Sequence, residues 1–234
     1  MVRADRPIRS THVSGTVDLT SESGASPANP VLSTRERVGR VAVSYVLIAI
    51  GVAVLVRSDV GVAPFDVLNT GLKESLDIPF SIAFLITSVV FYGTGVALGG
   101  RTGWASLVGT VVIAPLIEVA LAVVPETEVL IARIPMFVAG VLTVAVAVCL
   151  VISTELGAGP GEVFMLGLIA RGAPITSARW ITDGIAFLGG LALGGAVGFG
   201  TLVFAFAFGP LVATGLRLLR YTPPVLVAQA IVAP

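Results

Sequence analysis

Two acidic residues stand at matching places in a motif that occurs twice in the chain. The motif is a glycine, a proline three positions later and an acid two positions after the proline: Gly61, Pro64 and Asp66, then Gly157, Pro160 and Glu162. Proline fits the first turn of a helix, where its missing N–H costs nothing. The acid then lies near the positive end of the helix dipole. A carboxylate held there can bind a cation or an amine, or take up a proton.

The segments around these motifs are unusual for loops. Residues 60–72 and 156–170 each carry a single charge, so they are too apolar for ordinary water-exposed connections. They are also too short, and too interrupted by glycine and proline, to cross a bilayer. Paired interrupted segments of this kind mark the midplane site of many carriers. The alternative is a pair of interfacial helices whose acids serve only as caps, and the sequence leaves both interpretations open.

Three further ionisable residues lie within apolar runs. Glu118 is inside a predicted span, where a charge costs ~3 kcal/mol or more unless it is paired or hydrated. Arg179 and Asp183 are spaced as an i, i+4 ion pair on a helix, and a structural pair is the favoured interpretation. The candidate substrate- or ion-binding residues are therefore Asp66, Glu162, Glu118, Asp183 and Arg179.

Several kinds of chemistry are missing from the apolar part of the chain. The single histidine, His12, lies in the polar N-terminal segment, and the single cysteine, Cys149, lies in an apolar run and is expected to be a passive buried thiol. No Cys/His cluster offers a metal site. No Gly-Lys-Ser/Thr loop exists, and Lys73 is the only lysine, which excludes nucleotide-driven transport within this chain. We expect no catalytic residue, no metal and no cofactor, and therefore no enzyme.

The composition indicates that most of the chain lies in a lipid bilayer. Hydrophobic residues are 56% of the chain, charged residues are 12% and the mean hydropathy is +1.01. A soluble domain carries roughly 25% charged residues. We predict an all-α polytopic membrane protein of about six spans, because a helix pairs its own backbone N–H and C=O groups within the bilayer. The spans are expected at residues 41–56, 80–98, 104–124, 134–153, 178–193 and 199–219.

The ends of the chain and its charges complete the predicted topology. Residues 1–34 read as a disordered cytoplasmic tail and 222–234 as a short C-terminal tail. With the N-terminus inside, eight arginines lie on the cytoplasmic side: Arg35, Arg37, Arg40, Arg101, Arg171, Arg179, Arg217 and Arg220. Only Arg57, Lys73 and Arg133 lie outside. The positive-inside rule then places both termini in the cytoplasm of a bacterial cell and the loop 126–128 outside the plasma membrane.

The second half of the chain repeats the first at an offset of 96 positions, which becomes 95 after one residue is dropped. We expect two membrane repeats, 38–128 and 129–221, each with three spans and a broken half-helix after its first span. An odd number of spans makes the repeats inverted relative to each other. Glycines four apart should let neighbouring helices pack closely, with the last of each set serving a turn: Gly95, Gly99 and Gly103, and Gly190, Gly194 and Gly198.

These motifs resemble the YczE/YyaS/YitT family of bacterial integral membrane proteins, and the YczE branch in particular. The resemblance covers residues 41–220 and rests on the stretches 61–66, 71–72, 156–160, 193–201 and 209–210. The sequence departs from the family where Gly159-Pro160-Gly161-Glu162 replaces the usual Gly-Pro-Arg-Asp. The resemblance implies a membrane class and an architecture, but no substrate.

The sequence thus favours a secondary transporter or channel for a small solute, with a non-transporting accessory or scaffold membrane protein as the alternative. The expected partners are the lipid bilayer and a small solute or coupling cation. A homo-oligomer is compatible with the sequence, and the formal net charge of +0 suggests no nucleic-acid partner.

Overall fold

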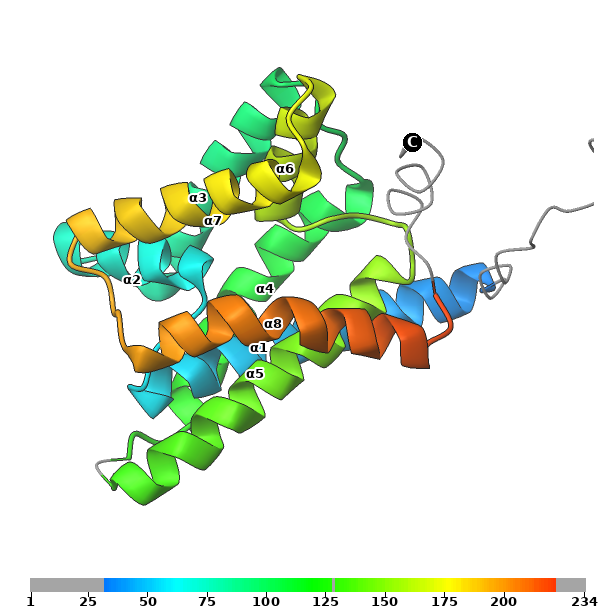
Figure 1. Cartoon of the computed structure of the whole chain (residues 1–234). Helices are drawn as coiled ribbons and strands as arrows, with labels where there is room; N and C mark the ends of the chain where they lie inside the picture. The colour runs from blue at the N-terminus through cyan, green and yellow to red at the C-terminus, as the bar shows by residue number, and fades with distance from the viewer. Residues whose placement is uncertain (1–31, 128, 222–234) are drawn as a thin grey trace, which may run out of the picture.

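The computed structural model describes residues 32–127 and 129–221, and this part of the chain forms eight helices and no strand (Figure 1). In chain order they are α1 (Thr34–Ser58), α2 (Pro64–Leu76), α3 (Phe80–Ala97), α4 (Trp104–Val123), α5 (Leu130–Ile152), α6 (Pro160–Ala170), α7 (Ile175–Ala192) and α8 (Phe199–Leu218). The predicted tails at 1–34 and 222–234 lie outside the described residues, except for positions 32–34.

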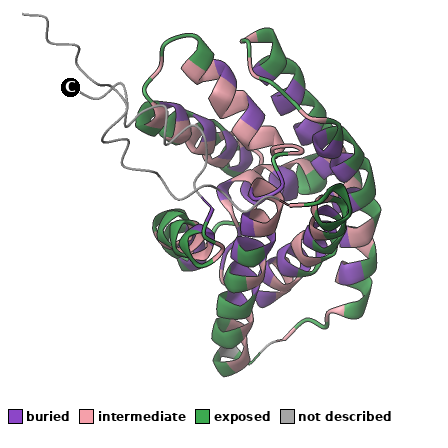
Figure 2. Cartoon of the chain, turned by 90° about the vertical axis from the view of Figure 1, so that its right-hand side faces the viewer, coloured by how far each residue is buried: buried purple, intermediate pink, exposed green. Residues whose placement is uncertain are grey.

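Five of these helices, α1, α3, α4, α5 and α8, are long and apolar enough to cross a membrane. The fifth predicted span, 178–193, corresponds to α7, which is as long as α3 (18 residues) but less apolar, since it carries Arg179 and Asp183. Exposed residues line the outer faces of the helices (Figure 2), and many of them are large and apolar. Such a surface suits contact with lipid. The predicted class, an all-α polytopic membrane protein, is confirmed.

The first span begins earlier than predicted, at Thr34 instead of Val41. Ser33 and Glu36 form a capping box: the Glu36 N–H donates to Ser33 Oγ at 3.3 Å, and the Ser33 N–H donates to Glu36 Oε2 at 2.8 Å. These bonds satisfy backbone donors that a helix start leaves open. The capping box at Ser33 and Glu36 therefore lets the helix begin in the polar segment before the apolar run.

The two predicted broken segments are short helices, α2 and α6, which begin at Pro64 and Pro160. Before each of them the chain reverses through a residue in the left-handed conformation, Asp59 (φ 52°) or Glu155 (φ 57°). Aspartate, with its short polar side chain, is among the residues that adopt this region most often after glycine. Each half-helix therefore starts in the interior, after an extended stretch that runs back from the end of a long helix.

The two halves of the chain make the same contacts with their roles exchanged. Helix α2 packs on α7, and its counterpart α6 packs on α3, while α1 packs along α5. The helices α1 and α5 run in opposite directions: Arg40 near the start of α1 donates to Ser153 at the end of α5 (3.0 Å), and Arg133 near the start of α5 pairs with Asp59 at the end of α1 (2.9 Å). Each half-helix is thus held by the other half of the chain.

The glycine sets play more than one role. A Cβ on Gly95 or Gly190 would lie under 3.0 Å from backbone atoms of α6 or α2, so these glycines allow close helix packing. Gly99 and Gly194 instead follow the ends of α3 and α7 with φ of 100° and 79°. No atom lies within 4 Å of the Cβ position of Gly194.

The turn therefore falls on the middle glycine of each set, and not on the last one as predicted. The last glycines, Gly103 and Gly198, precede α4 and α8 and lie against the carbonyl groups of Leu156 and Val60. They provide room for the extended stretches that lead into the half-helices.

Candidate functional site

A cavity of about 200 Å³ lies where the two half-helices begin, and we call it the inner cavity. All eight helices or their leading residues line it. Four of the five predicted candidates line it together: Asp66, Glu162, Arg179 and Asp183. The acids of the two repeated motifs therefore share one cavity, although 96 positions separate them in the chain.

Asp66 lies in the first turn of α2 and is 5% exposed. Its Oδ1 atom accepts a hydrogen bond of 3.1 Å from Nδ2 of Asn69, which is itself buried. Within residues 32–127 and 129–221, no arginine or lysine forms an ion pair with Asp66. Burying an unpaired carboxylate is costly, so the position of Asp66 needs a functional explanation.

The second half of the chain places a charge triad at the equivalent position. Arg179 donates through Nε to Asp183 Oδ2 at 2.8 Å, and its Nη1 lies 3.6 Å from Glu162 Oε1. The side chains of Glu162, Arg179 and Asp183 are 35%, 43% and 31% exposed. The predicted i, i+4 pair is present, and Glu162 extends it. At the offset of 96, the first half has Ala83 and Thr87 in place of Arg179 and Asp183, so only Asp66 lacks a charged partner.

Four of the five hydroxyl groups that line the inner cavity donate to backbone carbonyls; the fifth, on Ser106, accepts from the N–H of Ala158. The Tyr45 hydroxyl donates to the carbonyl of Ala105, and the Tyr92 hydroxyl lies 3.2 Å from the carbonyls of Ser106 and Ala158. Thr110 and Thr182 also donate to carbonyls one turn back on their own helices. These hydroxyls contribute few donors to a bound molecule.

Aromatic rings form much of the remaining wall. Six rings line the inner cavity: Tyr45, Phe65, Phe84, Tyr92, Phe204 and Phe208. Phe204 and Phe208 stack with ring centroids 4.5 Å apart. The walls therefore offer aromatic faces and carboxylate oxygens more than hydrogen-bond donors.

Two residues that sequence reasoning missed hold the extended stretches in place. The N–H of Ala158 donates to Ser106 Oγ at 2.8 Å, and the N–H of Val62 donates to Thr201 Oγ1 at 3.2 Å. Ser106 and Thr201 are equivalent at the offset of 95, as are Pro115 and Pro210. A hydroxyl at matching places of both copies was the signal that could have revealed this pair.

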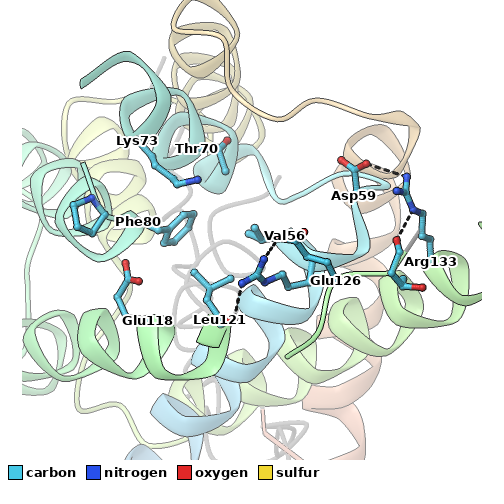
Figure 3. A pocket seen from close by; sticks show the side chains of 12 residues that line it. Val56, Asp59, Thr70, Lys73, Phe80, Glu118, Leu121, Glu126 and Arg133 are labelled. Carbon is cyan, nitrogen blue, oxygen red and sulfur yellow. Dashed lines mark hydrogen bonds and ion pairs between the residues drawn. The ribbon is translucent and has the colours of Figure 1, made fainter. Parts of the chain in front are cut away.

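A second, wider cavity of about 780 Å³ opens on one end of the helices, and we call it the basin (Figure 3). Its lining includes all three cations that the sequence placed outside, Arg57, Lys73 and Arg133. Arg57 pairs with Glu126, and Arg133 pairs with Asp59. The three cations therefore share one face of the protein, as the topology prediction requires.

The fifth candidate, Glu118, lies in the basin and not in the inner cavity. Its Oε1 atom accepts a hydrogen bond of 2.8 Å from the N–H of Ser81, in the first turn of α3. Pro79, the residue before α3, provides no side-chain cap. Glu118 thus caps a neighbouring helix, which accounts for a carboxylate near the end of an apolar span.

The basin and the inner cavity are stacked along the same helices, about one helical turn apart (~5.4 Å). On α1, Val52 lines the inner cavity and Val56 lines the basin; on α3, Phe84 and Phe80 divide in the same way. Phe80 is 2% exposed, and it packs in one apolar cluster with Val56 and the fully buried Ile117 of α4. We call Val56, Phe80 and Ile117 the apolar layer; along α1, α3 and α4 these residues come between those that line the inner cavity and the rest of the basin lining.

Comparison with known proteins gives a family but no activity. The profile of a family of unknown function (DUF6198) matches residues 36–216, which include all eight helices except their outermost residues. An uncharacterized protein of Haemophilus influenzae is 29% identical over 180 residues, covering 76% of this chain and 82% of that protein. No solved structure matches the chain.

Proposed function

The chain belongs to DUF6198, a family of unknown function, and we propose that it moves a small solute across the bacterial plasma membrane as a secondary transporter or channel. The observation that supports this proposal most is the inner cavity, whose lining includes Asp66 and Glu162 from the first turns of the two half-helices. Half-helices that meet within a membrane bundle are typical of carrier sites. A protein that only supports others has no evident need for an unpaired buried carboxylate.

The two cavities suggest a route for the solute. In the proposed topology the basin faces the outside, and the two halves of the chain are inverted in the bilayer. The apolar layer is buried or half-buried, whereas the triad of the inner cavity is partly exposed. We take this arrangement as a state closed to the outside. Opening toward the basin would require the side chains of the apolar layer to move apart.

Two further points belong to the proposal: the resemblance to a known family and the absence of enzyme activity. The resemblance to the YczE branch is a prediction that rests on the repeated glycine and proline motifs. We also propose that the protein is not an enzyme and uses no cofactor. The polar side chains of the inner cavity form ion pairs with one another or hydrogen bonds to carbonyls, and these contacts are not a nucleophile–base pair.

Cysteine accessibility tests the proposed route. In a Cys149→Ala background, which removes the single native cysteine, Val52→Cys places a thiol in the inner cavity, and Val56→Cys places one in the apolar layer where it lines the basin. Both proteins are reconstituted in vesicles and exposed to a membrane-impermeant thiol reagent from one side at a time. We expect Val56→Cys to react from the basin side only and Val52→Cys to react from both sides.

The matched pair distinguishes the alternatives. A scaffold without a route would leave Val52→Cys unreactive from both sides while Val56→Cys still reacts. That result would contradict transport through the inner cavity. The two positions are one turn apart on α1. A difference in their thiol reactivity therefore cannot result from unfolding or displacement of the whole helix.

A further inference from the structure

We infer that the inner cavity binds a small organic ammonium ion whose charged end contacts Asp66; this inference rests on the proposed function and specifies its substrate class. The charges of the lining support it first. Three carboxylates, on Asp66, Glu162 and Asp183, face one guanidinium, on Arg179. The two half-helix starts add about +0.5 each. The lining is thus left with a charge of about −1, which one monovalent cation neutralises.

The hydrogen-bonding groups support the same class. Arg179 already donates to Asp183 and pairs with Glu162, and four of the five lining hydroxyls donate to carbonyls. A bound molecule therefore has to bring its own donors to reach Asp66. An ammonium group has such donors, whereas a carboxylate or phosphate would face acceptors and like charge.

The walls favour an organic cation over a metal ion. Sodium or calcium needs a shell of several oxygen ligands. The lining residues that precede Asp66 in the chain, Ala63, Pro64 and Phe65, are instead apolar. Asn69 offers its amide N–H, and not its oxygen, to the carboxylate. Aromatic faces attract an organic cation by ~0.5–2 kcal/mol each, and apolar walls bind its hydrocarbon part.

The asymmetry of the two halves places the charged end. Glu162 is engaged by Arg179, so a cation there would have to displace an existing ion pair. Asp66 has no such pair in the described part of the chain and is the more buried of the two acids. The ammonium group therefore lies at the first turn of α2, and the hydrocarbon part points toward the aromatic rings.

Three probes of nearly equal size test the inference: benzylammonium, benzyl alcohol and benzoate. Binding to the full-length protein in lipid nanodiscs is measured by calorimetry and by the shift in melting temperature. We expect benzylammonium alone to bind at millimolar concentrations. Asp66→Asn should weaken its binding by about 10- to 100-fold, since a hydrogen bond to a charged group is lost. The control is Asp77→Asn, which changes an exposed acid at the other end of α2.

A measurement on the unaltered protein covers the case in which Asp66→Asn fails to fold. Dicyclohexylcarbodiimide modifies carboxyl groups in apolar surroundings, and mass spectrometry reports the extent at Asp66. Benzylammonium should slow this modification, and benzyl alcohol should not.

The outcomes separate this inference from the proposed function. Equal or tighter binding of benzoate or benzyl alcohol would overturn the ammonium class, as would sodium protecting Asp66 as well as benzylammonium does. Absence of binding by all three probes would overturn it too. In each case Val52→Cys could still react from both sides, which would leave the proposed route standing. Only loss of that reactivity would remove the route itself.

Discussion

Replacement of Gly190 by alanine should destabilise the protein, although alanine is the better helix former. Gly190 lies in α7 opposite the start of α2, and a Cβ there would find its three nearest neighbours within 2.5 Å, all of them backbone atoms of Val67 and Leu68. Ordinary contacts begin at 3.4 Å. The two helices would therefore have to separate by about 1 Å along the whole contact, because backbone atoms cannot rotate away as side chains do.

Two opposing effects set the change in the free energy of unfolding. Overpacking of a filled interior costs ~1–3 kcal/mol, and the upper end applies when the obstacle is backbone. The change from glycine to alanine within a helix returns ~0.5–1 kcal/mol. A net loss of about 2 kcal/mol remains. Gly184 on the same helix has no atom within 4 Å of its Cβ position, so Gly184→Ala should gain ~0.5–1 kcal/mol.

The two variants are compared by thermal unfolding in the same detergent or nanodisc. The difference of about 3 kcal/mol between them corresponds to roughly 6–12 °C on the scaling for chains of this length. If Gly190→Ala melts at or above Gly184→Ala, then α2 and α7 are not in backbone contact, and the exchanged packing of the half-helices is wrong.

Three other predictions concern the turns and the topology. Ser106→Ala should cost ~1–3 kcal/mol in unfolding free energy, since it leaves the N–H of Ala158 without its partner; an unchanged melting temperature would contradict this. Gly194→Ala should cost ~1–2 kcal/mol in thermal unfolding despite the open space around it, because φ is 79°, whereas Gly194→Asn should cost much less. Reporter fusions at Thr127 and Tyr221 should give opposite signals, and like signals would remove the inverted arrangement.

Much of the fold could be predicted because its determinants are local. The apolar runs set the spans, and Pro64 and Pro160 set the starts of the half-helices. The repeat itself predicted that the two acids are equivalent. The arginine and lysine distribution predicted that Arg57, Lys73 and Arg133 share a face, and these residues do line the basin.

The rest depends on contacts between segments that are far apart in the chain. Nothing in the sequence near Glu118 shows that it caps α3, since that role depends on the packing of α4 beside Ser81. The pairing of Arg179 with Glu162 depends in the same way on how α7 lies against α6. Glycine spacing alone cannot separate close packing at Gly190 from a left-handed turn at Gly194, because both need a residue without a side chain.

The exchange of half-helices between the two halves has a consequence for synthesis. Helix α2 ends at Leu76, but its packing partner α7 begins only at Ile175, about 100 residues later. At ~5–20 residues per second, the ribosome takes ~5–20 s to supply that partner. During this interval α2 can contact α3, which follows it directly, but the face that packs on α7 stays uncovered. Helix α1 can pair with α4 and then with α5 before α7 is made, so the contact between α2 and α7 comes late in assembly.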